Sequence, residues 1–109
     1  MHAFDVLSDP ARRRALELIA QHERASGEIV EVVGAEFGIS QSAVSQHLRV
    51  LRDSGFATVR KEGAKRCYSI DPKGFDDVEA WLDQLRHYWA PKMEALATEV
   101  ERGKRTKRR

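Results

Sequence analysis

The sequence predicts a mainly α-helical domain that carries one small β-hairpin. Apolar residues recur at the spacing of one helix face in several successive segments, which predicts about five helices. The region after Gly55 instead alternates apolar and polar residues on both sides of a turn at Gly63, which is typical of two paired strands. A long run of apolar residues at helical spacing follows residue 74 and predicts a long final helix.

The first half of the chain predicts three short helices. The run Ser8-Asp9-Pro10 is typical of a helix start, so a helix is expected over about 9–22 after a short helical N-terminus. Residues 25–27 are expected to form a loop before a helix over 28–37, and Gly38 is suited to end that helix in a left-handed conformation. The expected inward residues are Ala11, Ala15, Leu18 and Ile19, followed by Ile29, Val32, Val33 and Phe37.

The next helix, expected over 41–54, has a polar outer face. With Val44, Leu48 and Leu51 turned inward, the opposite side presents short polar groups and few acids. Serine and glutamine side chains hydrogen-bond base edges, and arginine binds guanine or phosphate. We therefore expect this face to contact DNA rather than only solvent, through Ser42, Ser45, Gln46 and Arg49, together with Gln41, which projects from the first turn of the helix.

Two expected strands within 56–70 form a basic hairpin whose candidate DNA-binding residues are Lys61, Lys65 and Arg66. Two helices joined by a turn and followed by such a hairpin are the order of a winged helix-turn-helix, with a DNA-reading part over 28–70. The final helix is expected over 75–102 with a kink at Pro91, which completes a domain over 1–102. Residues 103–109 lack apolar side chains and are expected to form a disordered basic tail. This tail either follows the DNA backbone or only keeps the protein soluble.

Charge is distributed unevenly along the chain. The net charge of +2 comes from 19 basic and 17 acidic residues, but the basic groups gather in 41–73 and 102–109. This distribution indicates a polyanion-binding surface on an otherwise acidic protein. No nucleophile–base pair and no glycine-rich phosphate loop points to an enzyme, and no cofactor is expected. The single cysteine, the absence of a long apolar run and an N-terminus without signal-peptide features favour a cytoplasmic protein that does not enter membranes.

Three segments together resemble the ArsR/SmtB family of regulators. The segments are 7–16 (LSDPARRRAL), 38–55 (GISQSAVSQHLRVLRDSG) and 59–70 (VRKEGAKRCYSI), and the resemblance covers about residues 4–72. It implies a homodimeric transcriptional repressor that dimerises through its first and last helices. Such a dimer is expected to bind an inverted-repeat operator. The resemblance also implies that the major groove is read by positions 41, 42, 45 and 46, three of which the helical wheel selects independently.

The metal-binding motifs of that family are missing. Its thiolate motif corresponds here to 28–33 (EIVEVV), which contains no sulfur. Its last-helix motif, aligned on His87, would need Asp, His and Glu where this chain has Gly74, Asp76 and Ala90. We therefore expect no metal site. His47 is expected to be a packed, hydrogen-bonded histidine, and Cys67 a small strand residue rather than a redox switch.

The final helix, at about 28 residues, would be about 42 Å long, and one winged domain is too small to cover its apolar side. A second copy of the chain is the expected cover, with an isologous interface formed by Phe4, Leu7, Trp81, Leu85, Tyr88, Trp89 and Leu96. Two alternatives remain open. The aromatic residues 81, 88 and 89 could line a pocket for an apolar small-molecule effector, or the domain could bind a protein instead of DNA.

Overall fold

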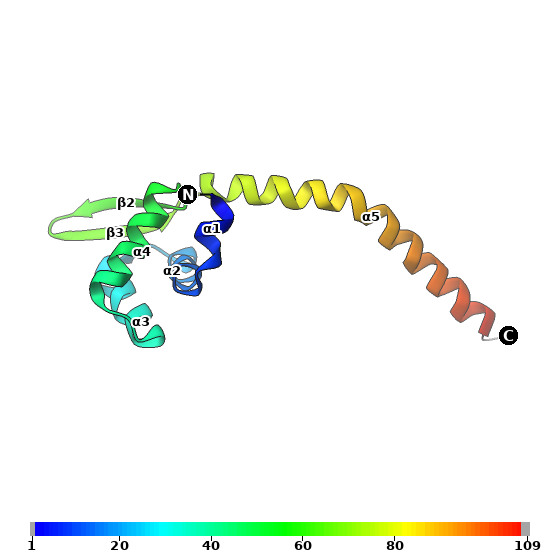
Figure 1. Cartoon of the computed structure of the whole chain (residues 1–109), viewed down its shortest axis with the longest axis horizontal. Coiled ribbons are helices and arrows are strands. Elements are labelled where there is room, and N and C mark those ends of the chain that lie inside the picture. The colour runs from blue at the N-terminus through cyan, green and yellow to red at the C-terminus, as the bar shows by residue number, and fades with distance from the viewer. Residues whose placement is uncertain (1, 108–109) are drawn as a thin grey trace. The chain divides into compact units, whose positions relative to one another are not determined.

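Five helices and three short strands make up residues 2–107, the part of the chain that this computed structural model describes (Figure 1). Side chains are described for residues 2–100. The elements are α1 (Ala3–Ser8), α2 (Pro10–Gln21), β1 (Arg24–Ala25), α3 (Ser26–Phe37), α4 (Gln41–Asp53), β2 (Ala57–Glu62), β3 (Lys65–Ile70) and α5 (Lys73–Lys107). The chain divides into two compact units, one ending at Val78 and one starting at Glu79.

Apolar faces of the first four helices pack together to form the core of the first unit. The largest fully buried side chains come from α1, α3, α4 and the turn before β2: Val6, Ile29, Val33, Val44, Leu48, Leu51 and Phe56. The inward stripes predicted for α2 and α4 are confirmed. The prediction for α3 is wrong at Phe37, which is 38% exposed because it is the last residue of the helix, where the chain turns away at Gly38.

Local capping residues set the helix boundaries. The Asp9 carboxylate accepts hydrogen bonds from the backbone N–H groups of Ala11 and Arg12, and Pro10 occupies the first helical position of α2. Gly38 ends α3 with φ 63° and ψ 36°, and Ser40 caps α4 by accepting from the N–H of Ala43. These caps are the ones that the sequence predicts, since each depends only on neighbouring residues.

The sheet has three strands where the sequence predicts two. β1, β3 and β2 lie in that order, and both pairs are antiparallel. Arg24 pairs with Tyr68 and Ala25 with Cys67, so residue 25 is part of a strand rather than of the expected loop, and α3 begins at Ser26. A two-residue strand has no alternation to detect, and its partner lies more than forty residues along the chain.

Helix α5 is longer than the sequence predicts. It begins at Lys73 and reaches Lys107, so it includes residues 103–107 of the segment expected to be disordered, and residues 108–109 lie outside the described residues. Lysine and arginine are good helix formers, and positive charge is favourable at a helix C-terminus. Pro91 lies inside the helix, and Figure 1 shows the α5 ribbon bending in its middle part, as a proline kink predicts.

Replacing Gly74 with alanine is expected to lower the free energy of unfolding by about 1–3 kcal/mol. The Gly74 N–H donates to the carbonyl of Gly55, and an added Cβ would lie only 2.7 Å from that oxygen and 2.7 Å from Cγ of the buried Phe56. Urea unfolding measures the decrease. Gly27→Ala is the matched control, because its Cβ would meet nothing within 4 Å and should leave stability equal or higher.

Candidate nucleic-acid interface

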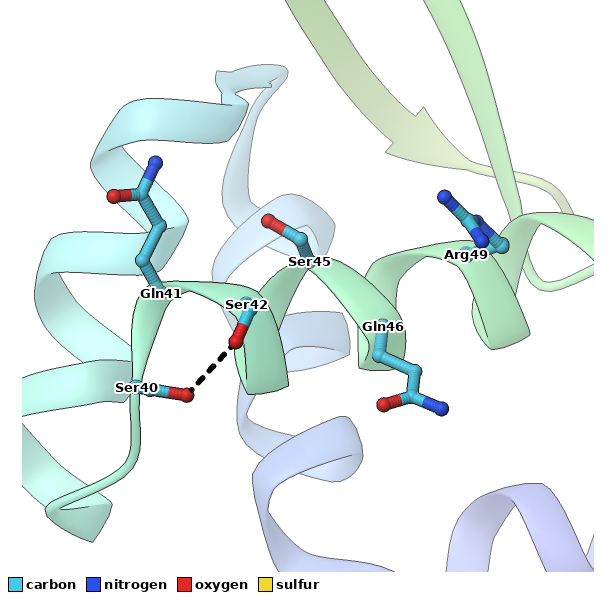
Figure 2. Close-up of a pocket in the computed structure, with 6 residues that line it drawn as sticks. All are labelled: Ser40, Gln41, Ser42, Ser45, Gln46 and Arg49. Carbon is cyan, nitrogen blue, oxygen red and sulfur yellow. Dashed lines mark hydrogen bonds between the residues drawn. The ribbon is translucent and has the colours of Figure 1, made fainter.

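Two rows of polar side chains run along the exposed face of α4 (Figure 2). Gln41, Ser45 and Arg49 point to one side of the helix, and Ser42 and Gln46 point to the other. Each row follows the spacing of four residues that places side chains on one helix face. Together with Ser40 these side chains line one surface pocket, so the structure brings together all five DNA-binding candidates that the sequence places on this helix.

Most of these side chains are available to an outside partner. In the described part of the chain, no hydrogen bond or ion pair engages the side chains of Gln41, Ser45, Gln46 or Arg49. Ser42 differs, since its hydroxyl lies 3.2 Å from that of Ser40, which itself caps the helix. The exposed face therefore offers amide, hydroxyl and guanidinium groups, the chemistry that reads base edges.

A buried apolar face and one histidine hold α4 against the rest of the first unit. Val44, Leu48 and Leu51 are at most 1% exposed. His47 lies beside the start of α2, with its Nδ1 3.4 Å from Nη1 of Arg12 and its Nε2 3.9 Å from Oδ2 of Asp9. This placement agrees with a packed, hydrogen-bonded histidine, and His47 is not among the residues that line the surface pocket on the exposed face of α4.

The same cluster perturbs the carboxyl group of Asp9. Partial burial acts to raise the pKa of Asp9, but the hydrogen bond from Arg12, the charge of His47 and the hydrogen bond from Ala11 outweigh it and hold the pKa below its ordinary value. Asp9 is therefore ionised when it caps α2, as a charged cap at a helix N-terminus should be.

The hairpin of β2 and β3, the wing, carries exposed cations in positions that an anion can reach. Lys61 lies directly across from Arg66 in the register, and neither has an ion pair in the described part of the chain. Like charges at opposed positions destabilise a hairpin unless an outside anion screens them. Lys65 lies across from Glu62 at the tip of the wing. Arg66 also lines a second pocket beside α4, whereas Lys61 and Lys65 line neither pocket.

Arg60, by contrast, is neutralised by two carboxylates, one in the wing and one before β1. Hydrogen bonds to Glu23 and then to Glu62 raise the pKa of Arg60 above its ordinary value. The hydrogen bond from Arg60, followed by one from Ser69, lowers the pKa of Glu23. Arg60 therefore ties β2 to the turn before β1 and is a poor candidate for contacting DNA.

Two polar residues, one on α4 and one at the start of α3, are missing from the sequence-based prediction. Arg52 and Ser26 line the second pocket together with Ser45, Arg49 and Arg66. The spacing of three residues after Arg49 could have indicated Arg52. Nothing in the local sequence indicates Ser26, because the pairing of β1 with β3 brings its segment close.

The second unit presents apolar side chains to its surroundings. Trp81, Tyr88, Trp89 and Leu96 are 45%, 77%, 50% and 58% exposed, and Leu85 is partly buried. In the first unit, Phe4 is 38% exposed and Leu7 packs partly against the core. All seven residues expected at a dimer interface are thus at least partly accessible in the single chain.

Other chemistry is limited in the part of the chain that the structure describes. Cys67 is buried in β3, between Ala25 of β1 and Arg60 of β2. Among residues 2–100, no three histidine, cysteine, aspartate or glutamate side chains are grouped so that they could hold a metal ion. Over the same residues, none of the helices combines the length and apolar character needed to cross a membrane.

Residues 9–59 match the model of a family described as "Bacterial regulatory protein, arsR family". A "Probable mercury resistance operon repressor" of Streptomyces lividans is 43% identical over 76 residues, which are 69% of this chain and 58% of that protein. The chain thus matches little more than half the length of that relative.

Solved structures share the fold over most of the chain. The crystal structure of a "Possible transcriptional regulator for arsenical resistance" is 34% identical, with a TM-score of 0.64, and covers 91% of this chain and 96% of its own. A second is the solution structure of the homodimeric winged helix-turn-helix DNA-binding domain of "a possible ArsR-family transcriptional regulator" from Mycobacterium bovis. It is 25% identical, with a TM-score of 0.58, and covers 79% of this chain and 78% of its own. The winged helix-turn-helix expectation is confirmed.

Proposed function

This chain belongs to the arsR family of bacterial regulatory proteins, and from that membership we propose that it is a sequence-specific, homodimeric transcriptional repressor. It acts by binding double-stranded DNA rather than by catalysis, and it does so in the cytoplasm. Helix α4 enters the major groove, and the wing contacts the DNA backbone beside it.

The exposed face of α4 carries this proposal. Gln41, Ser45, Gln46 and Arg49 have hydrogen-bonding groups that nothing in the described chain engages, while the opposite face of the same helix is buried. A surface that binds a protein would present apolar groups here. Glutamine pairs naturally with adenine, and arginine with guanine or phosphate, so this face favours DNA as the partner.

The homodimer is supported by two observations. The Mycobacterium bovis relative is a homodimer, and the second unit of this chain exposes a stripe of apolar side chains. In a two-fold dimer the two α4 helices face successive major grooves about 34 Å apart. The operator is therefore an imperfect inverted repeat with half-sites about one helical turn apart.

Sequencing of the genomic fragments that the purified protein retains tests the function. The expected result is a small set of enriched fragments that share an inverted repeat, with protection of both half-sites in footprinting. Equal retention of all fragments at physiological salt, where nonspecific binding is weak, would contradict a sequence-specific role.

Lys65→Ala is expected to weaken binding to the operator and to random DNA by similar factors, and to flatten the dependence of affinity on salt. The reason is that a lysine at the wing tip meets phosphates, which carry no sequence information. Titration of both DNAs at several salt concentrations measures the effect, with Lys92→Ala in the second unit as the control for removal of one charge. A change of sequence preference without a change of salt dependence would instead assign base reading to the wing.

A further inference from the structure

Three arginines line a pocket of about 260 Å³ between α4 and the wing. Arg49 and Arg52 lie three residues apart on α4, and Arg66 comes from β3. The hydroxyls of Ser26 and Ser45 complete the polar lining. Leu48 and Tyr68 also line the pocket and are 1% and 5% exposed, so part of its wall belongs to the core.

The positive charge of this pocket is largely uncompensated. Arg49 and Arg66 have no ion pair in the described part of the chain, and Arg52 has only Asp53, with 3.2 Å between Nε and Oδ1. Guanidinium groups held together repel one another, and an anion between them relieves that repulsion. Arg60, on the same wing, differs from these three arginines because it forms ion pairs with both Glu23 and Glu62.

The start of α3 adds a second anion-attracting feature. Ser26 is the first residue of this helix, and its capping residue, Ala25, offers no side-chain hydrogen bond to the first N–H groups. Backbone N–H groups at a helix start that have no side-chain cap favour a negative charge beside them. Three guanidinium groups, two serine hydroxyls and a helix start without a side-chain cap are the donors that bind a phosphate.

The pocket adjoins the reading face, because Ser45 and Arg49 line both. In DNA the phosphates form the rim of the groove whose floor presents the base edges. A helix that reads bases with one face therefore meets phosphates along its flank. We propose that this pocket binds a phosphodiester of the DNA backbone, and that Arg52, with Arg49, Arg66 and Ser26, positions α4 in the groove. The proposal rests on the DNA-binding function proposed above.

Arg52→Gln tests the site. Affinity for operator and for random DNA should fall by the same factor, about tenfold or more, as expected when a charged hydrogen bond is removed. The slope of log affinity against log salt should fall by about one for each phosphate that the protein no longer neutralises. Arg86→Gln, which removes the same charge from the second unit, should leave both quantities unchanged. Thermal unfolding checks that both variants are folded.

Asp53→Asn provides a test of opposite sign. Removing the carboxylate that competes for Arg52 should strengthen binding to operator and to random DNA, and the two affinities should rise by similar factors. An unchanged salt slope in Arg52→Gln would overturn the proposal. A loss of affinity confined to the operator would also overturn it, because Arg52 would then read bases rather than bind a phosphate.

Inorganic phosphate tests the pocket without DNA. Titration followed by NMR should shift the Nε–H signal of Arg52 and the amide signal of Ser26 in a saturable way, and the Ser26 shift should vanish in Arg52→Gln. Absence of these shifts would overturn the pocket as a phosphate site. If the wild-type protein bound no DNA but gave these shifts, the proposed function would fail while the anion site remained, so the two failures are distinguishable.

Discussion

Replacing Leu96 with glutamate is expected to convert the protein from a dimer to a monomer at micromolar concentration. Leu96 lies in the apolar stripe of the second unit and is 58% exposed in the single chain. Burying a leucine side chain is worth about 1.5–3 kcal/mol. A two-fold interface loses that amount twice, and a buried, unpaired carboxylate adds a further cost. The dissociation constant of the dimer should therefore rise by about 10²–10⁴-fold, at 1.4 kcal/mol for each factor of ten.

Light scattering and sedimentation measure the change in mass, and operator binding should fall with it because a monomer holds one half-site. Thr98→Glu is the matched control. It adds the same charge two residues later on the other side of α5, where the threonine hydroxyl donates to the carbonyl of Glu94. The control should remain dimeric. A Leu96→Glu protein that stayed dimeric with full operator affinity would place the interface elsewhere.

Gln46→Ala and Gln41→Ala are each expected to weaken operator binding by roughly 30-fold or more. A bidentate contact between an amide and a base discriminates by about 1–3 kcal/mol, and the substitution occurs in both half-sites of a dimer. Affinity for random DNA should change little, since the glutamine amide meets bases and not phosphates. Competition titrations with operator variants should show relaxed preference at the base pair that each glutamine meets.

Gln84→Ala controls for the removal of an exposed glutamine, because this residue lies in the second unit and not on α4. It should leave sequence preference intact. Glutamine variants whose affinity fell equally for every DNA would show that these side chains contact the backbone, and the reading role would then pass to Ser42 or Ser45.

The difference between Arg60 and Arg66 shows why the sequence predicts the site only in part. Both are wing arginines in a basic segment, and the local sequence does not distinguish them. In the folded chain Glu23, from the turn before β1, engages Arg60 and leaves Arg66 without an ion pair in the described residues. The sequence-based choice of Arg66 agrees with this arrangement, but only the fold supplies its reason.

Local sequence is enough to specify the helices of the first unit, their caps and the polar face of α4. These features depend on residues within a few positions of one another, as the cap at Asp9, the turn at Gly38 and the stripe of Val44, Leu48 and Leu51 show. The third strand, the engagement of Arg60 and the convergence of Ser26, Arg52 and Arg66 depend instead on how the chain folds back on itself. Each of these joins segments that are far apart in the chain, and no local pattern encodes which distant partner a short strand or an arginine will meet.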